Sequence, residues 1–238
     1  MLKRILKIIF VFVLGIGGGI FADQILWPYF IERPLFFKYR LDQAPVYVTE
    51  NNQITVQENV ALQSAVEKVK NAVVALSVKT KSGKQIKGSG LVITSDGLVA
   101  TLAELVPQGA KFSLFLDSKP VDFRVLKRDL NKNLALIKVE EKSLTTAAFS
   151  APDKIKLGER VFLLAKVVAG GSEQDIVNEG VIRSLDENYI QTTIMEKTEI
   201  EGSPLFNIEG EVLGLNFVDS DAKFSAVSVK IIREFAGI

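Results

Sequence analysis

Apolar and polar residues alternate in short runs over most of the chain, and turn residues such as 95–97 (Ser-Asp-Gly) separate these runs. This pattern is typical of antiparallel strands. The first group of runs comprises residues 73–80, 85–94, 98–101, 111–117, 121–129 and 134–140, and the second comprises 160–166, 176–182, 189–194, 203–208, 211–218 and 224–229. The two groups predict a mainly β protein with two six-stranded antiparallel β-barrels, at about 73–140 and 156–229.

The N-terminus has a different pattern, in which basic residues precede an uncharged apolar stretch, residues 8–22. The basic residues are Lys3, Arg4 and Lys7. As a helix, residues 8–22 cover only about 22 Å of a ~30 Å hydrocarbon core. A signal peptide cleaved after Ala22 is one interpretation. The other, which we favour, is an uncleaved transmembrane anchor over residues 1–31, in which the aromatic stretch 25–31 lies at the far interface.

The positive flank of this segment predicts the orientation of the chain. Basic residues stay on the cytoplasmic side, so the rest of the chain is expected outside the inner membrane, in a periplasm-like compartment. Cleavage would instead release a secreted protein.

Between the N-terminal segment and the strands, residues 32–55 combine prolines, aromatic residues and a polar end, which indicates a stalk. Residues 56–72 have apolar positions at three- and four-residue steps and predict a short amphipathic helix. Thr55 can cap this helix, with Glu58 three residues later. Residues 230–235 predict a short helix at the C-terminal end.

The composition restricts the chemistry. Among 238 residues there is no histidine and no cysteine, which removes the commonest general base, thiol nucleophiles and the usual zinc ligands. We therefore expect no metal and no cofactor. The formal net charge of +1 gives no electrostatic reason to expect nucleic acid as a partner.

Five sequence blocks, in order, resemble the protease domain of the HtrA/DegP-type trypsin-like serine peptidases. They are GSGLVITSDGLVAT (88–101), RDLNKNLALIKVE (128–140), YIQTTI (189–194), GSPLFNIEGEVLGLN (202–216) and FSAVSVKII (224–232). The resemblance implies a double β-barrel of chymotrypsin type over 56–238, an N-terminal anchor and a role in protein quality control. It also implies a homotrimer formed through N-terminal segments, for which the aromatic stretch 34–47 is the candidate. We expect no PDZ domain, although one commonly follows this domain in the family.

The resemblance also locates the positions of the catalytic triad. Glu104 stands where the family has its histidine, Asn133 where it has its aspartate, and Glu201 where it has its serine. Glu199 replaces the first glycine of the oxyanion loop. A triad needs a hydroxyl, a base that shuttles its proton and an acceptor that orients the base. Glu201 has no hydroxyl, Glu104 could accept a proton but has nothing to activate, and Asn133 has no imidazolium to stabilise. We therefore interpret the chain as a pseudopeptidase without catalytic residues, which binds extended or misfolded polypeptides or regulates an active homologue.

Two alternatives for the function remain open. The chain could be an active endopeptidase or other hydrolase, using Ser203 as an unconventional nucleophile, with Lys197 as a candidate base, or using Glu104 and Glu201 as a pair of carboxylates. It could also be a structural scaffold of the cell envelope.

Overall fold

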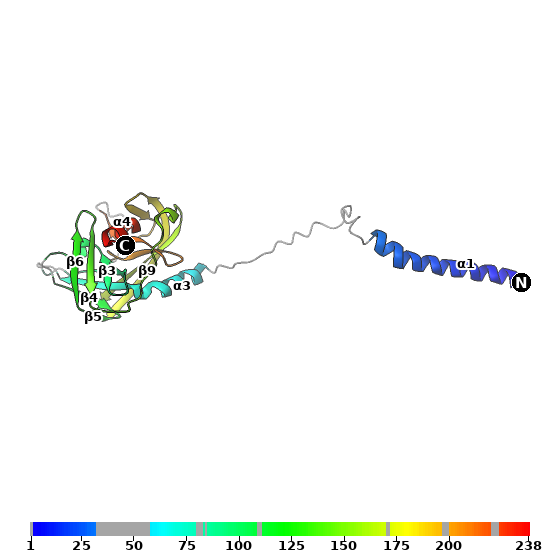
Figure 1. Ribbon diagram of the computed structural model, residues 1–238, viewed down its shortest axis with the longest axis horizontal. Helices are drawn as coiled ribbons and strands as arrows, with labels where there is room; N and C mark the ends of the chain where they lie inside the picture. Colours follow the sequence, from blue (N-terminus) through cyan, green and yellow to red (C-terminus); the bar gives the residue numbers. More distant parts are fainter. Residues whose placement is uncertain are drawn as a thin grey trace. The chain divides into compact units, whose positions relative to one another are not determined.

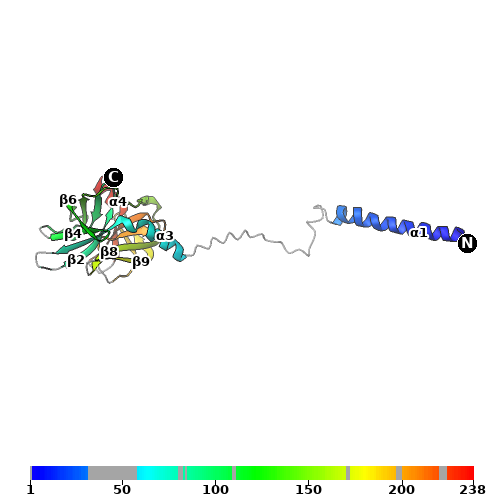
Figure 2. The same cartoon turned by 90° about the horizontal axis from the view of Figure 1, so that it is seen from below.

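The computed structural model describes residues 2–31, 58–79, 83, 85–108, 111–169, 172–196, 200–219 and 224–238. The predicted stalk, the aromatic stretch 34–47 and the capping residue Thr55 lie outside these residues. The internal contacts of the chain divide it into two units, Met1–Ile54 and Thr55–Ile238 (Figures 1 and 2).

The described residues of the N-terminal unit form an apolar helix. They comprise the α-helix α1 (Leu2–Phe21), which continues as a π-helix, η1 (Ala22–Ile31). Within it, Leu2–Trp27 is long and apolar enough to cross a membrane. The helix therefore continues beyond the short stretch 8–22, as the predicted anchor requires, although a signal sequence near the N-terminus has the same length and composition.

The first sheet of the C-terminal unit is antiparallel and has seven strands, in the order β5-β4-β1-β2-β3-β7-β6. The strands are β1 (Val73–Lys79), β2 (Gln85–Val92), β3 (Leu98–Thr101), β4 (Lys111–Leu116), β5 (Lys119–Val121), β6 (Phe123–Asp129) and β7 (Leu134–Val139). Its two edge strands, β5 and β6, are separated in the chain by Asp122 alone. The chain therefore passes from one edge to the other, which curls the sheet into a half-barrel. The rings of Phe112 and Phe123 lie 4.7 Å apart and join β4 to β6.

The second sheet is a closed barrel of six strands in the order β10-β13-β12-β11-β8-β9. The strands are β8 (Arg160–Ala169), β9 (Ser172–Leu185), β10 (Tyr189–Thr192), β11 (Pro204–Asn207), β12 (Val212–Val218) and β13 (Phe224–Ser228). All of them pair antiparallel. The hairpin of β8 and β9 contains the two longest strands and is paired as far as Ala169 and Ser172.

Two helices and three short 3₁₀ turns are present besides the strands in the described part of this unit. The helices are α3 (Glu58–Val69) and α4 (Val229–Ala236), and the turns are η2 (Lys70–Ala72), η3 (Ala103–Leu105) and η4 (Pro152–Lys154). The Ser228 hydroxyl caps α4 by accepting from the backbone N–H of Lys230, and Gly237 ends the helix with a φ of 78°. Its left-handed conformation suits glycine, which has no Cβ.

Three apolar clusters stabilise this arrangement. One fills the closed barrel and includes Leu163 and Leu213, and one fills the first sheet and includes Leu76 and Ile137. The third joins α3, α4 and strands of both sheets. It contains large side chains such as Phe162 and Phe206, whose rings stack with centroids 5.3 Å apart. The two sheets therefore share an apolar interface.

The predicted mainly β architecture is confirmed, with two differences in the first sheet, which is a half-barrel where the sequence predicts a closed barrel and which has one more strand than predicted. The sequence pattern predicts one strand over 121–129. The structure starts this region earlier, at Lys119, and interrupts it at Asp122, so seven strands are present instead of six. Both predicted helices are present over their described residues.

Candidate functional site

Glu104 and Asn133 lie together at the rim of the first sheet. Glu104 is exposed in the 3₁₀ turn η3, directly after β3. Asn133 immediately precedes β7, and its Nδ2 donates to Oε1 of Glu104 at 3.2 Å. In return, the backbone N–H of Glu104 donates to Oδ1 of Asn133 at 3.4 Å. The two positions that the resemblance assigned to the family's histidine and aspartate are thus in direct contact.

The turn between β6 and β7 presents Asn133 to Glu104. Oδ1 of Asp129 accepts from the backbone N–H groups of Asn131 and Lys132, which closes the turn. Asn133 then adopts a φ of 49°, a left-handed conformation that asparagine tolerates better than most residues. Its carbonyl oxygen accepts from the N–H of Ala103 at 3.2 Å, so the backbone also joins the two segments.

Glu201 is joined to the first sheet through its backbone. Its carbonyl oxygen accepts from the backbone N–H of Ser89 in β2 at 2.8 Å. Gly202 follows, with a φ of 74°, and a Cβ at this position would overlap the carbonyl oxygen of Ser89. Only glycine fits here, because both the conformation and the space exclude a side chain.

Leu105, next to Glu104, contacts the same glycine-lined segment. A Cβ on Gly88 would lie 2.5 Å from Cδ1 of Leu105 and 2.7 Å from the carbonyl oxygen of Glu201. A Cβ on Gly202 would lie 2.9 Å from the same Leu105 atom. The segments 104–105 and 201–202 therefore meet at one point between the two sheets.

Ser203 lies behind this point and is buried. Its exposed fraction is 0%, and Nδ2 of Asn216 donates to both its carbonyl oxygen, at 2.9 Å, and its hydroxyl, at 3.2 Å. The backbone of Asn216 adds two further hydrogen bonds, to Gly202 and Ser203. This geometry is that of a structural serine, and a substrate carbonyl has no access to its hydroxyl.

Other residues of the predicted site are not described. Glu199 and Lys197 lie outside the described residues. In the part of the chain that the structure describes, no three of the Asp, Glu, His or Cys side chains lie together as a metal site. Glu201 itself makes at least one interaction in addition to the backbone contacts given above.

Three residues that the sequence did not single out hold the site together. Ser89 binds Glu201 through its backbone N–H, and its carbonyl oxygen accepts from the hydroxyl of Thr101 at 2.7 Å. Nε of Arg128 donates to the carbonyl oxygen of Ala103 at 3.0 Å. The motif GSG and the end of β3 contain two of these residues, but their role depends on contacts between segments that are distant in sequence.

Apolar side chains are exposed on loops and strand ends of the C-terminal unit. Leu130, in the β6–β7 turn that also carries Asn133, is 68% exposed, and Met195, in the segment that leads to Glu201, is 85% exposed. On the second barrel, the rings of Tyr189 and Phe217 lie 5.7 Å apart, and both are accessible. A hollow of about 600 Å³ lies behind η3, between the segment 106–108 and strands β4 and β6.

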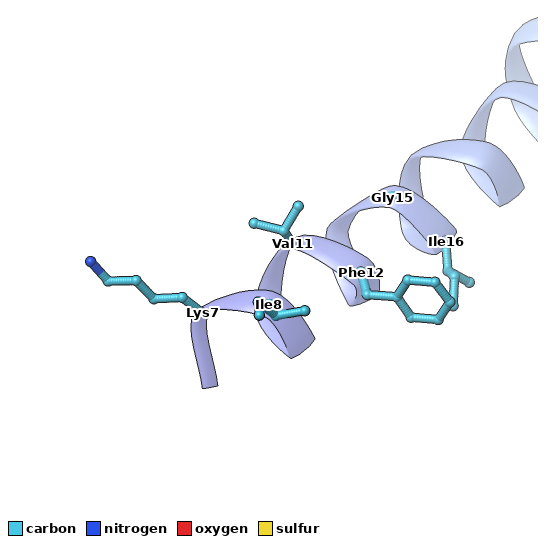
Figure 3. A pocket seen from close by; sticks show the side chains of 6 residues that line it. All are labelled: Lys7, Ile8, Val11, Phe12, Gly15 and Ile16. Atoms are coloured by element: carbon cyan, nitrogen blue, oxygen red, sulfur yellow. The ribbon is translucent and has the colours of Figure 1, made fainter. Parts of the chain in front are cut away.

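A hollow of similar size lies on the N-terminal helix and is of another kind. It follows one side of α1 past Gly15, where Phe12 and Ile16 lie next to each other (Figure 3). Apart from Lys7 its lining is apolar, so it offers little for acid–base chemistry.

The profile of the trypsin-like peptidase domain matches residues 88–215. The matched range covers more than half of the chain and contains Glu104, Asn133 and Glu201. The chain therefore belongs to the family of trypsin-like peptidase domains.

Several curated relatives bear names from the HtrA/DegP group. A probable periplasmic serine endoprotease DegP-like from Hahella chejuensis is 33% identical over 144 residues, which cover 56% of this chain and 29% of the relative. A protein of the same name from Ectopseudomonas mendocina is 30% identical over 141 residues, with the same two coverages. Serine protease HTRA1 from Xenopus laevis is 28% identical over 163 residues, 62% of this chain and 35% of the relative. This chain thus spans about a third of the length of these relatives.

Proposed function

We propose that this chain is a non-proteolytic member of its family, which binds extended polypeptides at the junction of its two sheets. The observation that carries the proposal is the set of side chains at the three triad positions. Glu104 and Asn133 are hydrogen-bonded to each other, and Glu201 offers no hydroxyl for acylation. Acyl transfer requires a nucleophile activated by a base, and this pair has nothing to activate.

The buried state of Ser203 supports this proposal over an unconventional peptidase. A nucleophile must reach the substrate carbonyl, whereas the Ser203 hydroxyl is enclosed and accepts a hydrogen bond from Asn216. The carboxylates of Glu104 and Glu201 would need a bound cation or a shared proton to act together in a hydrolase. The amide of Asn133 already engages Glu104, which leaves that carboxylate less available for such a role.

Polypeptide binding is supported by exposed apolar side chains in the sequence segments next to the site residues. Extended peptides combine main-chain hydrogen bonds with apolar side chains at alternating positions. Leu130 and Met195 offer apolar contacts on the two segments that carry Asn133 and Glu201. The names of the relatives describe serine endoproteases, so loss of cleavage would leave a holding function.

We also propose that the domain works outside the cytoplasm, attached to the membrane by α1. Two relatives are named as periplasmic proteins, and the apolar helix Leu2–Trp27 follows the pattern of an anchor with a basic cytoplasmic flank. A homotrimer formed through residues 34–47 remains part of this proposal, as does regulation of an active homologue.

The experiment separates binding from cleavage. The full chain in detergent micelles is incubated with fluorescein-labelled, unfolded casein, while fluorescence anisotropy reports binding and gel electrophoresis reports cleavage. A fluorophosphonate probe, which reacts only with an activated hydroxyl, is added in parallel. We expect saturable binding, intact casein and no labelling.

Two variants serve as controls. Glu104→Gln keeps the shape of the side chain and is expected to change casein affinity, since it alters the charge at the site, whereas Glu234→Gln, on the exposed face of α4, is not. Cleavage that disappears in Ser203→Ala, or a covalent adduct on the unmodified chain, would refute the proposal. Absence of both binding and cleavage would favour the scaffold.

A further inference from the structure

A buried ion pair lies between the two strands of the long hairpin. Nζ of Lys166 in β8 lies 3.8 Å from Oε2 of Glu173 in β9, and each side chain is 7% exposed. The second carboxylate oxygen of Glu173 is buried and, among the described residues, accepts no hydrogen bond. The backbone N–H of Glu173 also donates to the hydroxyl of Ser118, which lies in the β4–β5 turn of the first sheet, at 3.4 Å.

Stability alone does not explain this pair. Removing two charges from water is costly, and the cost is recovered only when the remaining polar atoms are also satisfied. Here the separation is long, and the second carboxylate oxygen has no donor within the described part of the chain. Replacing a buried ion pair by apolar residues of similar size is often neutral or stabilising, so stability gives no sufficient reason for this pair.

Ser89 connects this pair to the candidate site. Its hydroxyl accepts from the backbone N–H of Lys166 at 2.9 Å and donates to the carbonyl oxygen of the same residue at 3.0 Å. Its backbone N–H holds the carbonyl oxygen of Glu201, and its own carbonyl oxygen accepts from the hydroxyl of Thr101. Thr101 ends β3, three residues before Glu104. One buried serine therefore contacts the hairpin, the segment of Glu201 and the strand that leads to Glu104.

We propose that the Lys166–Glu173 pair is a positioning element for the site, and that it acts through the Ser89 hydroxyl. With the pair intact, the Lys166 backbone is held where it can both donate to and accept from Ser89. Without the carboxylate, the Lys166 ammonium group is buried without its counter-ion and turns toward water. The strand backbone at Lys166 moves with it, Ser89 loses its two hydroxyl bonds, and the segment at Glu201 loosens.

Hydrogen–deuterium exchange on the full chain in detergent micelles tests this. Glu173→Gln is expected to accelerate exchange at the amides of Ser89, Gly202 and Ser203 at least about tenfold, because these amides lie in the segments that Ser89 holds. The amides of β10, which pairs with β9 and β13 within the closed barrel, keep their rates. Ser89→Ala, which preserves the ion pair and removes the link, is expected to give the same local increase.

Two matched variants make the test specific. Glu179→Gln disrupts the Arg160–Glu179 pair on the same two strands, which is 2.8 Å long and much more exposed, and it should leave the three amides unchanged. The double variant Lys166→Leu/Glu173→Leu removes both charges and should restore slow exchange. The inference is overturned if Glu173→Gln accelerates all protected amides equally, if it leaves these three unchanged, or if the double variant does not restore them.

This inference rests on the proposed function in one respect, because it takes the residues around Glu104 and Glu201 as the binding site. Exchange is measured without any ligand. A failure of casein binding and a failure of this coupling are therefore separate outcomes.

Discussion

The side chain of Asn133 donates to the carboxylate of Glu104 across 3.2 Å. An amide can make this bond and a carboxylate cannot, because an ionised carboxylate only accepts. The residues that the resemblance assigns to the histidine and aspartate positions of the family thus bind each other directly. This bond joins the turn after β3 to the turn before β7.

Replacement of Asn133 tests this contact. Asn133→Asp places a second carboxylate against Glu104 and is expected to lower the free energy of unfolding by about 1–2 kcal/mol at neutral pH. Asn133→Gly also removes the bond, but it relaxes the left-handed backbone and should cost less. Thermal unfolding of both variants gives the comparison. Equal stability of the Asp variant and the unmodified chain would show that the bond is absent in solution.

A variant with a rebuilt triad tests whether the side chains alone account for the proposed absence of peptidase activity. We expect the combined variant Glu104→His, Asn133→Asp, Glu201→Ser and Glu199→Gly to react with a fluorophosphonate probe, since the backbone contacts at Ser89 and Gly202 remain. All three triad positions must be restored together, because in subtilisin the loss of a single triad member already reduces turnover by up to ~10⁶. The same variant without Glu201→Ser is the control and should stay unlabelled. Failure of the complete variant to react would indicate that the oxyanion loop is also changed.

The Asp96–Lys138 pair predicts an effect of acid on stability. Nζ of Lys138 lies 2.6 Å from Oδ2 of Asp96, and this hydrogen bond, followed by one from the Thr94 hydroxyl, lowers the pKa of Asp96 below its usual 3.8. A lowered pKa in the folded state stabilises the protein above the unfolded pKa, and the contribution disappears as the pH falls through the folded value.

Unfolding temperatures measured between about pH 2 and pH 6 check this expectation. Asp96→Asn should unfold at a lower temperature than the unmodified chain at pH 6, and the difference should diminish toward pH 2. Asp153→Asn, in the exposed turn η4, is the charge-matched control. A difference that is constant over the whole range would contradict the pKa shift.

Two glycines separate backbone strain from steric overlap. Gly202 and Gly158 have similar φ values, 74° and 78°, but only Gly202 is enclosed, by Ser89, Leu105 and Thr101. Gly158→Ala should therefore cost about 1 kcal/mol of stability from the backbone alone, and Gly202→Ala clearly more, up to ~3 kcal/mol or beyond. Equal costs, measured by chemical unfolding, would mean that the backbone at 202 is free to move.

Most of the fold follows from local pattern. Each of the twelve predicted runs contains a strand, and the pattern also locates both helices, because alternation and turn residues determine these elements within a few positions. The β8–β9 hairpin is longer than the pattern predicts. Residues 172–175 are polar and show no alternation, yet they pair fully with β8 up to Ala169 and Ser172. Tertiary pairing outweighs local pattern there.

The candidate site could be predicted only in part. The resemblance gives Glu104, Asn133 and Glu201 by position, and the structure brings the first two into contact and joins the backbone of the third to the same region. The roles of Ser89 and Arg128 depend on contacts between residues at least 12 positions apart, and no local pattern encodes them. The sequence pattern does not predict that Lys166 and Glu173 form a buried ion pair, because alternation along a strand indicates only on which face of the sheet a residue lies.

The contacts described above between 104–105 and 201–202 use main-chain atoms, two small hydroxyl side chains, one leucine and two glycines. None of these contacts involves the carboxylate of Glu104 or Glu201. Main-chain contacts of this kind do not depend on the chemistry of the side chains beside them. New side chains at positions 104 and 201, for new ligands or new reactions, therefore require that the two glycines stay and that the bond between Glu104 and Asn133 is replaced.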